Sequence, residues 1–273
     1  MTRSVRRTRR MLQLAGAGAA ALMALSACSS SDGDSSPKSD RSTSASPKLS
    51  GTVTVFAAAS LKESFTTLGK EFEQQHPGTK VTFNFGGSDT LAASITGGAP
   101  ADVFAAASPK TMAIVTDKKD AVGTPATFVR NQLEIATLPG NPDKVSSLKD
   151  LTKSGLKVVL CDRTVPCGAA AQKALDAGKL KLTPASYEQD VKSALNKVEL
   201  KEADAAVVYK TDVKSAGGKV EGVEFPESAQ AINDYPIVLL KNAPNAEAAK
   251  AFIALVQSAE GQKVLSRAGF LKP

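Results

Sequence analysis

From Gly51 onward, short apolar segments rich in β-branched residues alternate with longer segments of helical periodicity. Residues 52–56 (TVTVF) are typical of a buried strand, and residues 61–75 then repeat apolar side chains every three or four positions. Further strands are predicted at 80–85, 101–105, 133–137, 157–160, 205–209 and 235–240, and a long helix at 246–259. This order predicts an α/β fold with largely parallel sheets.

Residues 1–27 are predicted to be an export signal. Basic residues at 3–10 precede an apolar run at 11–25 and two small residues, a pattern typical of secretory signals. Leu25-Ser26-Ala27-Cys28 is similar to the bacterial lipobox, in which the cysteine is acylated and becomes the mature N-terminus. We therefore expect lipidation at Cys28, with an ordinary cleaved signal as the alternative. Thr8-Arg9-Arg10 leaves twin-arginine export open beside the general route.

Residues 28–50 are predicted to be a disordered tether. This stretch holds ten serines and almost no apolar side chain, so it cannot bury enough surface to offset its ordering entropy. A lipid at one end and a folded body at the other place the protein on the extracytoplasmic face of the cell membrane. The membrane is then a partner through the anchor alone.

The charge of the chain argues against nucleic acid as a partner. The full chain has 34 basic and 27 acidic residues, a formal charge of +7, but removal of the signal leaves 29 basic residues against the same 27 acidic ones. A body so close to neutral has no electrostatic footprint for nucleic acid. One histidine and three cysteines also give too few ligands for a dedicated transition-metal site.

Several predicted helices begin with small or hydroxyl residues. Ser60, Ser88, the turn containing Cys167 and the segment at Val191 each stand at such a start. A helix N-terminus presents unpaired N–H groups and a partial positive charge, which suit an anion. Taken alone, each serine reads more simply as a helix cap.

A resemblance to a known family gives these helix starts a specific interpretation. Residues 53–65 and 83–108, followed by 165–175, 190–195 and 204–213, resemble the periplasmic molybdate-binding proteins of ABC importers, here in lipoprotein form. The likeness runs through residues 51–273 in the same order. In that family two serines, two backbone amides and one tyrosine hydroxyl hold the oxyanion. The matching positions are Ser60, Ser88, Cys167, Val191 and Tyr209.

The resemblance implies a two-lobed periplasmic-binding-protein fold of type II with a ligand cleft between the lobes. Residues 51–130 with 231–273 would form one lobe and residues 131–230 the other. It also implies a monomer that captures molybdate or tungstate and passes it to a membrane permease. Such a protein has no catalytic residue and no cofactor. Cys167 departs from the family, where alanine is usual, but only its backbone N–H is required.

The implied site has a defined chemistry. The five residues supply seven neutral donors, which suit a fully deprotonated oxyanion and reject a protonated phosphate that must itself donate. The ion is bound as an oxyanion and not as a bare cation. Sulfate has the same charge and shape but is smaller, so a receptor for sulfate or thiosulfate stays open as an alternative.

Two further interpretations concern the cysteines and the serines. Cys161 and Cys167 in an exported chain favour a disulfide, with two reduced buried thiols as the alternative. A secreted hydrolase using Ser60 or Ser88 is a second alternative. It is disfavoured because the sequence has no GxSxG motif, and His76 precedes a proline at a predicted helix end.

Overall fold

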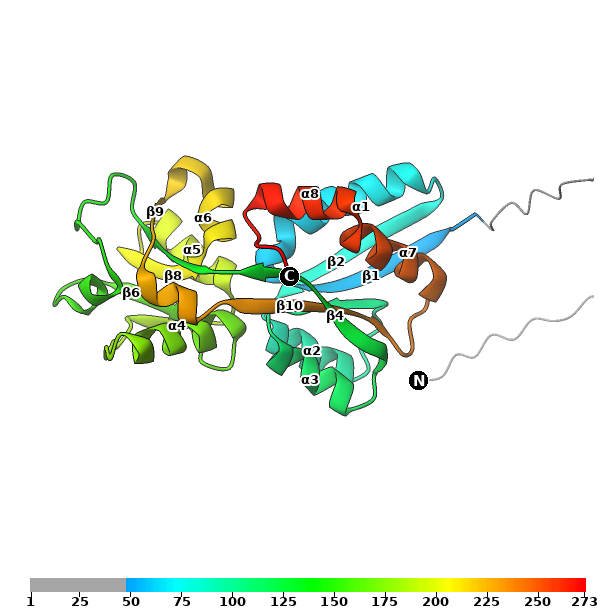
Figure 1. The fold of residues 1–273 in the computed structure, drawn as a ribbon, viewed down its shortest axis with the longest axis horizontal. Coiled ribbons are helices and arrows are strands. Elements are labelled where there is room, and N and C mark those ends of the chain that lie inside the picture. The colour runs from blue at the N-terminus through cyan, green and yellow to red at the C-terminus, as the bar shows by residue number, and fades with distance from the viewer. Residues whose placement is uncertain (1–47) are drawn as a thin grey trace, which may run out of the picture. The chain divides into compact units, whose positions relative to one another are not determined.

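The computed structural model describes residues 48–273, which form two five-stranded sheets (Figure 1). The predicted export signal, Cys28 and most of the predicted tether lie outside these described residues. The first sheet has the order β2 (Thr79–Gly86), β1 (Gly51–Ala58), β3 (Val103–Ala105), β10 (Asn233–Leu240) and β4 (Ala121–Asn131). The second has the order β7 (Ser186–Glu188), β6 (Val158–Cys161), β8 (Ala205–Tyr209), β5 (Leu133–Thr137) and β9 (Glu221–Val223).

The α/β class is confirmed, but the prediction of largely parallel sheets is wrong. Strand β1 runs parallel to β2 and β3, and β6 runs parallel to β7 and β8. By contrast, β10 is antiparallel to β3 and β4, and β5 is antiparallel to β8 and β9. The reason is the path between the sheets. Only Gln132 separates β4 from β5, so β5 begins at the edge of the second sheet where β8 ends, and it runs opposite to β8.

Helices cover both faces of the first sheet. Helices α1 (Lys62–Gln75), α7 (Ala246–Gln257) and α8 (Ala259–Ala268) lie on one face, and α2 (Ser88–Thr96) and α3 (Pro109–Asp117) on the other (Figure 1). Side chains of β1 alternate between the two cores: Val53 and Val55 pack with α1 and α7, whereas Phe56 packs with α2 and α3. Burial on both faces explains why β1 reads as a continuous apolar run.

The second sheet is covered in the same way. Helix α4 (Pro166–Ala177) lies on one face, and α5 (Val191–Glu199) and α6 (Lys210–Ala216) lie on the other (Figure 1). We call the first sheet with its helices the first lobe, and the second sheet with its helices the second lobe. The residue boundaries that the sequence predicts for the lobes stay predictions.

The predicted helix at 246–259 corresponds to α7 except at its last two residues, which belong to the start of the next helix, α8. Helix α7 ends at Gln257, Ser258 adopts an extended conformation, and its Oγ accepts a hydrogen bond of 3.1 Å from the N–H of Gly261. A serine hydroxyl that caps the next helix competes with continuation of the previous one. The spacing of apolar residues does not predict that the helix ends at Gln257.

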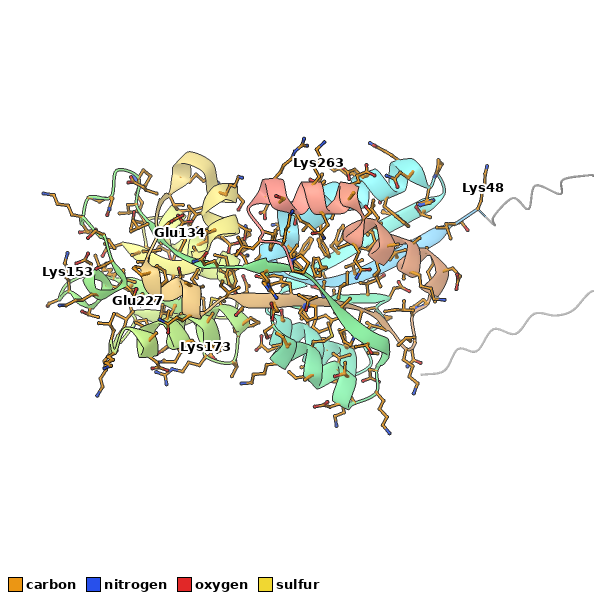
Figure 2. All side chains as sticks on the ribbon, in the orientation of Figure 1. Lys48, Glu134, Lys153, Lys173, Glu227 and Lys263 are labelled. Atoms are coloured by element: carbon orange, nitrogen blue, oxygen red, sulfur yellow. A yellow bond between two sulfur atoms is a disulfide. The ribbon has the colours of Figure 1, made fainter. Side chains whose placement is uncertain are left out.

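Three lysines illustrate the charge on the outside of the molecule. Lys153, Lys173 and Lys263 are exposed and point away from the two sheets (Figure 2). Their charge is therefore not gathered at the interior where the lobes meet. Within residues 48–273, none of the helices is long and apolar enough to cross a membrane.

Candidate functional site

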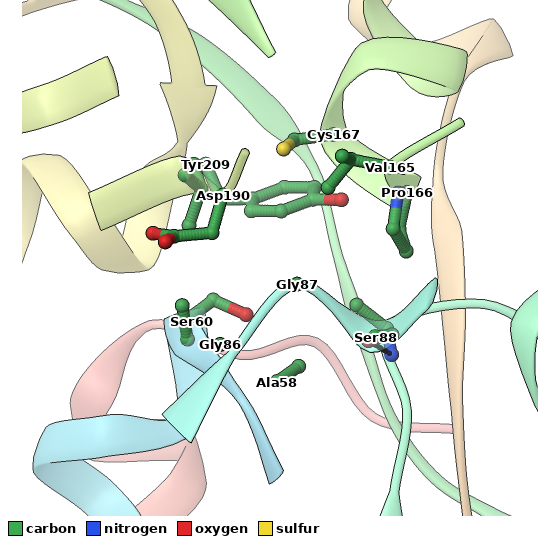
Figure 3. A pocket seen from close by; sticks show the side chains of 13 residues that line it. Ala58, Ser60, Gly86, Gly87, Ser88, Val165, Pro166, Cys167, Asp190 and Tyr209 are labelled. Carbon is green, nitrogen blue, oxygen red and sulfur yellow. Dashed lines mark hydrogen bonds between the residues drawn. The ribbon is translucent and has the colours of Figure 1, made fainter. Parts of the chain in front are cut away.

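The structure brings the five predicted site residues together around one pocket between the lobes (Figure 3). Ser60 and Ser88 approach from the first lobe, while Cys167, Val191 and Tyr209 approach from the second. The complete lining comprises Ala58, Ala59, Ser60, Gly86, Gly87, Ser88, Ala107, Val165, Pro166, Cys167, Asp190, Val191 and Tyr209. Residues more than a hundred positions apart in sequence thus face the same small space.

In the first lobe, the ends of two neighbouring parallel strands deliver the serines. Ser60 lies in a short 3₁₀ turn (Ala59–Leu61) directly after β1, and Ser88 is the first residue of α2 after β2. Both are buried, with exposed fractions of 4% and 1%. Neither hydroxyl caps its helix, since α1 and α2 have Leu61 and Gly87 at the N-cap positions. The capping interpretation of these serines is therefore wrong.

In the second lobe, two helix N-termini meet the same pocket. Cys167 is the second residue of α4, and Val191 is the first residue of α5. Asp190 caps α5, because its Oδ1 accepts hydrogen bonds from the N–H groups of Lys192 and Ser193 at 2.8 and 3.0 Å. Amides at the first positions of a helix have no intrahelical acceptor, so those of Cys167 and Val191 are available to a ligand.

The start of α4 is held to the end of β6 by a disulfide between Cys161 and Cys167. Gly168 lies beside it, where an added Cβ would overlap the backbone of Asp162. Glycine is therefore required for the helix to begin this close to the strand. The bridge and the glycine together fix the position of the Cys167 amide.

Each site hydroxyl has a hydrogen-bond partner within the protein. Ser88 Oγ accepts from the Ala107 N–H at 3.0 Å, and Tyr209 OH accepts from Asn233 Nδ2 at 2.8 Å. Ser60 Oγ lies 2.8 Å from the hydroxyl of Tyr235. Burial raises the pKa of the Tyr209 hydroxyl well above its ordinary value, so it keeps its proton and remains a donor at neutral pH.

The pocket presents dipoles and no positive counter-charge from its described lining. Of the described residues that line it, none is Lys or Arg, and the carboxylate of Asp190 is occupied at the α5 cap. The free volume is about 10 Å³, far below the roughly 300–1,000 Å³ of pockets for drug-sized ligands. The donors suit an oxyanion, whereas the free volume of this arrangement is close to that of a single water, so a tetrahedral ion would require the lobes to part slightly.

The structure does not supply a base for a serine hydrolase. His76, the single histidine of the chain, follows the last residue of α1, whereas Ser60 precedes the first. The 14 residues of α1 separate them by about 20 Å, at 1.5 Å per residue. Neither Ser60 nor Ser88 has a hydrogen bond to a carboxylate among the described residues.

Two polar contacts join the lobes beside the pocket. Lys192 Nζ, at the start of α5, lies 3.0 Å from Glu63 of α1 and 3.2 Å from Asp212 of α6. Thr164 Oγ1 in the second lobe donates to Asp89 Oδ2 of α2 at 3.3 Å. Burial alone lowers the pKa of Lys192, but the carboxylates of Asp212 and Glu63 raise it overall. The ammonium therefore stays charged between two acids from opposite lobes.

Sequence reasoning missed the side chains behind the pocket. Asn233 and Tyr235 stand at the start of β10 and contact Tyr209 and Ser60, yet neither lines the pocket. Two polar residues with a spacing of two at the head of an apolar strand are a signal that could have found them, because such residues point to the same face.

Comparison with known proteins identifies the family. Residues 53–271 match the family model described as bacterial extracellular solute-binding protein. The chain belongs to this family. A molybdate-binding protein ModA from Mycobacterium tuberculosis is 43% identical over 221 residues, which cover 81% of this chain and 85% of the relative. The protein is accordingly an extracytoplasmic solute-binding protein of the transporter type and not an enzyme.

Solved structures share the fold of this solute-binding protein. The periplasmic molybdate-binding protein of Azotobacter vinelandii matches with a TM-score of 0.71 and 21% identity, covering 81% of this chain and 99% of that one. The sulfate-binding protein SubI of M. tuberculosis matches with a TM-score of 0.68 and 18% identity, covering 81% and 86%. These likenesses show a periplasmic-binding-protein fold. They do not distinguish between anions, because the two matched structures are named for different ones.

The buried carboxyl of Asp212 predicts how the stability of this solute-binding protein depends on pH. Burial raises the pKa of Asp212 from 3.8 to about 6, although Lys192 and the Tyr209 N–H oppose this shift. A group whose pKa is higher in the folded state contributes stability below its unfolded pKa and loses it as pH rises. We therefore expect Asp212→Asn to flatten the pH dependence of the unfolding midpoint between pH 3.8 and about 6.

Urea denaturation at several pH values measures this midpoint. Asp117→Asn, at an exposed acid of α3, is the matched control and should keep the wild-type slope. An unchanged slope in Asp212→Asn would show that the buried carboxyl does not titrate in this window.

Proposed function

We propose that this protein captures molybdate in the pocket between its lobes, accepts tungstate as well, and delivers the ion to the permease of an ABC importer. One observation carries the proposal: hydroxyl and amide donors from both lobes converge on a compact pocket whose described lining has no positive side chain. The molybdate-binding relative at 43% identity supports the choice of ion. Molybdate is then a ligand and not a cofactor.

The donor set explains which anions are accepted. Ser60, Ser88 and Tyr209 would donate from their hydroxyls, and the amides of both serines, Cys167 and Val191 would complete the set. A hydrogen bond to a charged group contributes roughly 1.5–3 kcal/mol, so several such bonds offset the desolvation of a dianion. A protonated phosphate would place its own hydrogen against a donor. Sulfate carries no such hydrogen, and its discrimination depends on size alone.

Ligand binding would stabilise the closed arrangement of the lobes. A single anion reaches its full donor set only when Ser60 and Ser88 stand opposite Cys167, Val191 and Tyr209. A ligand with higher affinity for the closed state shifts the population toward it. The closed form would be the one that docks on the permease.

The first test removes single hydroxyls from each lobe. Ser88→Ala and Tyr209→Phe should each weaken molybdate binding about ten- to a hundredfold, because each deletes one charge-assisted bond. Ser64→Ala, a buried serine of α1 that does not line the pocket, and Tyr187→Phe, at an exposed tyrosine, are the controls. Calorimetric titration of the folded variants measures the effect, and wild-type affinity in both site variants would contradict the assignment.

Ser88→Ala should also lower stability, unlike Tyr209→Phe. The Ala107 N–H donates to Ser88 Oγ and would be left without an acceptor, whereas Asn233 keeps the carbonyl of Ala107 as a partner. Affinities are therefore compared at a temperature where thermal unfolding shows both variants folded.

The second test blocks closure without touching a donor. A Cβ at Gly87 would lie 2.5 Å from the backbone oxygen of Gln189 in the other lobe, although φ −61° and ψ 131° suit alanine. Gly87→Ala should therefore keep its melting temperature and lose at least about tenfold in affinity. Gly218→Ala, where the added Cβ meets open space, is the control. Unchanged affinity in Gly87→Ala would mean that binding does not require this approach of the lobes.

The third test concerns the membrane anchor, which we infer from Leu25-Ser26-Ala27-Cys28 and the serine-rich stretch after it. Cys28→Ala should release the protein from the membrane fraction, while the body still binds the oxyanion. Cell fractionation and mass spectrometry of the mature N-terminus provide the measurement. Wild-type protein in the medium with an unmodified N-terminus would rule the anchor out.

A further inference from the structure

The two partners of the binding hydroxyls stand on one strand. Asn233 and Tyr235 are separated by two positions at the start of β10, so their side chains leave the same face of the first sheet. Both are buried, with exposed fractions of 7% and 0%. From this face Asn233 reaches Tyr209 in the second lobe, and Tyr235 reaches Ser60 in the first.

The direction of the hydrogen bond at Tyr209 follows from the other partners of Asn233. The Asn233 Nδ2 atom lies 2.9 Å from the carbonyl oxygen of Ala107 and 3.3 Å from that of Pro166. Carbonyl oxygens only accept, so this atom is the NH₂ nitrogen and not the amide oxygen. The Tyr209 oxygen, 2.8 Å away, must therefore accept from it. The hydroxyl hydrogen of Tyr209 is left to donate elsewhere.

The neighbouring contacts favour one direction for the hydrogen bond at Ser60. Asn131 Oδ1 accepts from the Gln132 N–H at 3.0 Å, which places the NH₂ group of Asn131 toward Thr211 and Tyr235. That NH₂ donates to the Tyr235 oxygen at 3.4 Å, so the hydrogen of Tyr235 is free to point to Ser60 Oγ at 2.8 Å. Burial raises the pKa of Tyr235 well above its ordinary value, so this hydrogen is retained at neutral pH.

We propose that Asn233 and Tyr235 are positioning residues that bias the hydroxyls of Tyr209 and Ser60 toward donating to the anion. Each hydroxyl would accept one hydrogen bond from the protein, which occupies one of its two lone pairs and leaves its hydrogen available to the anion. Ser88 follows the same rule, because its oxygen accepts from Ala107, whose carbonyl in turn accepts from Asn233. A hydroxyl that already accepts one hydrogen bond is a poorer acceptor for a ligand that carries a proton. This inference rests on the proposed function and assigns selectivity for unprotonated oxyanions to residues outside the pocket lining.

Tyr235→Phe tests the positioning role of the Tyr235 hydroxyl without disturbing the packing of its ring. The ring contacts with Phe270 and Tyr209 are kept, and Asn131 retains Thr211 as an acceptor at 2.8 Å. Ser60 then loses its donor, and its hydroxyl can rotate or accept. We expect molybdate affinity to fall about two- to tenfold. Affinity for hydrogen phosphate should not fall in parallel, so the ratio of the two affinities should decrease. Tyr187→Phe, the exposed counterpart, should change neither.

A double-mutant cycle separates positioning from structural support. If Tyr235 acts through Ser60, Tyr235→Phe should weaken anion binding by less than about twofold when Ser60 is already replaced by alanine. Asn233→Ala should likewise lose most of its effect in a Tyr209→Phe background. The inference would be overturned if each substitution weakened anion binding by the same factor in wild-type protein and in its mutant background. This comparison requires folded variants with matched melting temperatures. Calorimetry supplies the affinities for all variants.

The cycle is measured with whichever oxyanion wild-type protein binds among molybdate, tungstate, sulfate and thiosulfate. Binding of sulfate or thiosulfate without molybdate would overturn the proposed function, while a non-additive cycle with that ion would still support the positioning roles. Binding of molybdate with an additive cycle would overturn the positioning roles alone. Binding of none of the four would overturn both.

Discussion

A buried anion without a positive partner can be held only by hydrogen-bond donors that point at it. The desolvation of a charged ligand is costly, and a neutral pocket must return that free energy through many charge-assisted bonds. The proposed site meets this requirement. Strand ends and helix N-termini supply backbone donors at fixed positions, and buried hydroxyls supply the rest. The donors of the proposed site are therefore set by the positions at which strands end and helices begin.

Strand β10 connects this requirement with the two-lobed arrangement. It belongs to the first sheet, follows the return of the chain from the second sheet, and bears Asn233 and Tyr235 at its start. The NH₂ group of Asn233 contacts the carbonyl of Ala107 in the first lobe and both Pro166 and Tyr209 in the second. One buried amide thus joins both walls of the pocket. In the proposed mechanism, lobe closure and donor orientation would depend on these same hydrogen bonds.

Much of this could be predicted from the sequence. The strands at 133–137 and 205–209 match β5 and β8, since apolar runs between turn residues have few alternative readings. The five site positions came from motifs rather than from periodicity, and they meet in one pocket. Their assignment to an oxyanion stays a proposal. The single-residue passage from β4 to β5 was not predictable, because no local propensity marks a strand that changes sheets.

The residues behind the pocket were missed for a related reason. Hydrogen bonds such as Tyr235 to Ser60 join positions 175 apart, and sequence spacing has no bearing on such contacts. The ion pair between Lys192 and Glu63 likewise exists only because the lobes approach each other. Local chemistry is visible in one sequence, while long-range polar pairing depends on the completed fold.

Calorimetric titration of the mature wild-type protein with molybdate, tungstate, sulfate and phosphate tests the central claim most directly. A neutral donor pocket for deprotonated tetrahedral ions of molybdate size predicts saturable binding of molybdate and tungstate, with far weaker binding of phosphate and of sulfate. Binding of phosphate as tightly as molybdate, or of sulfate without molybdate, would contradict the account.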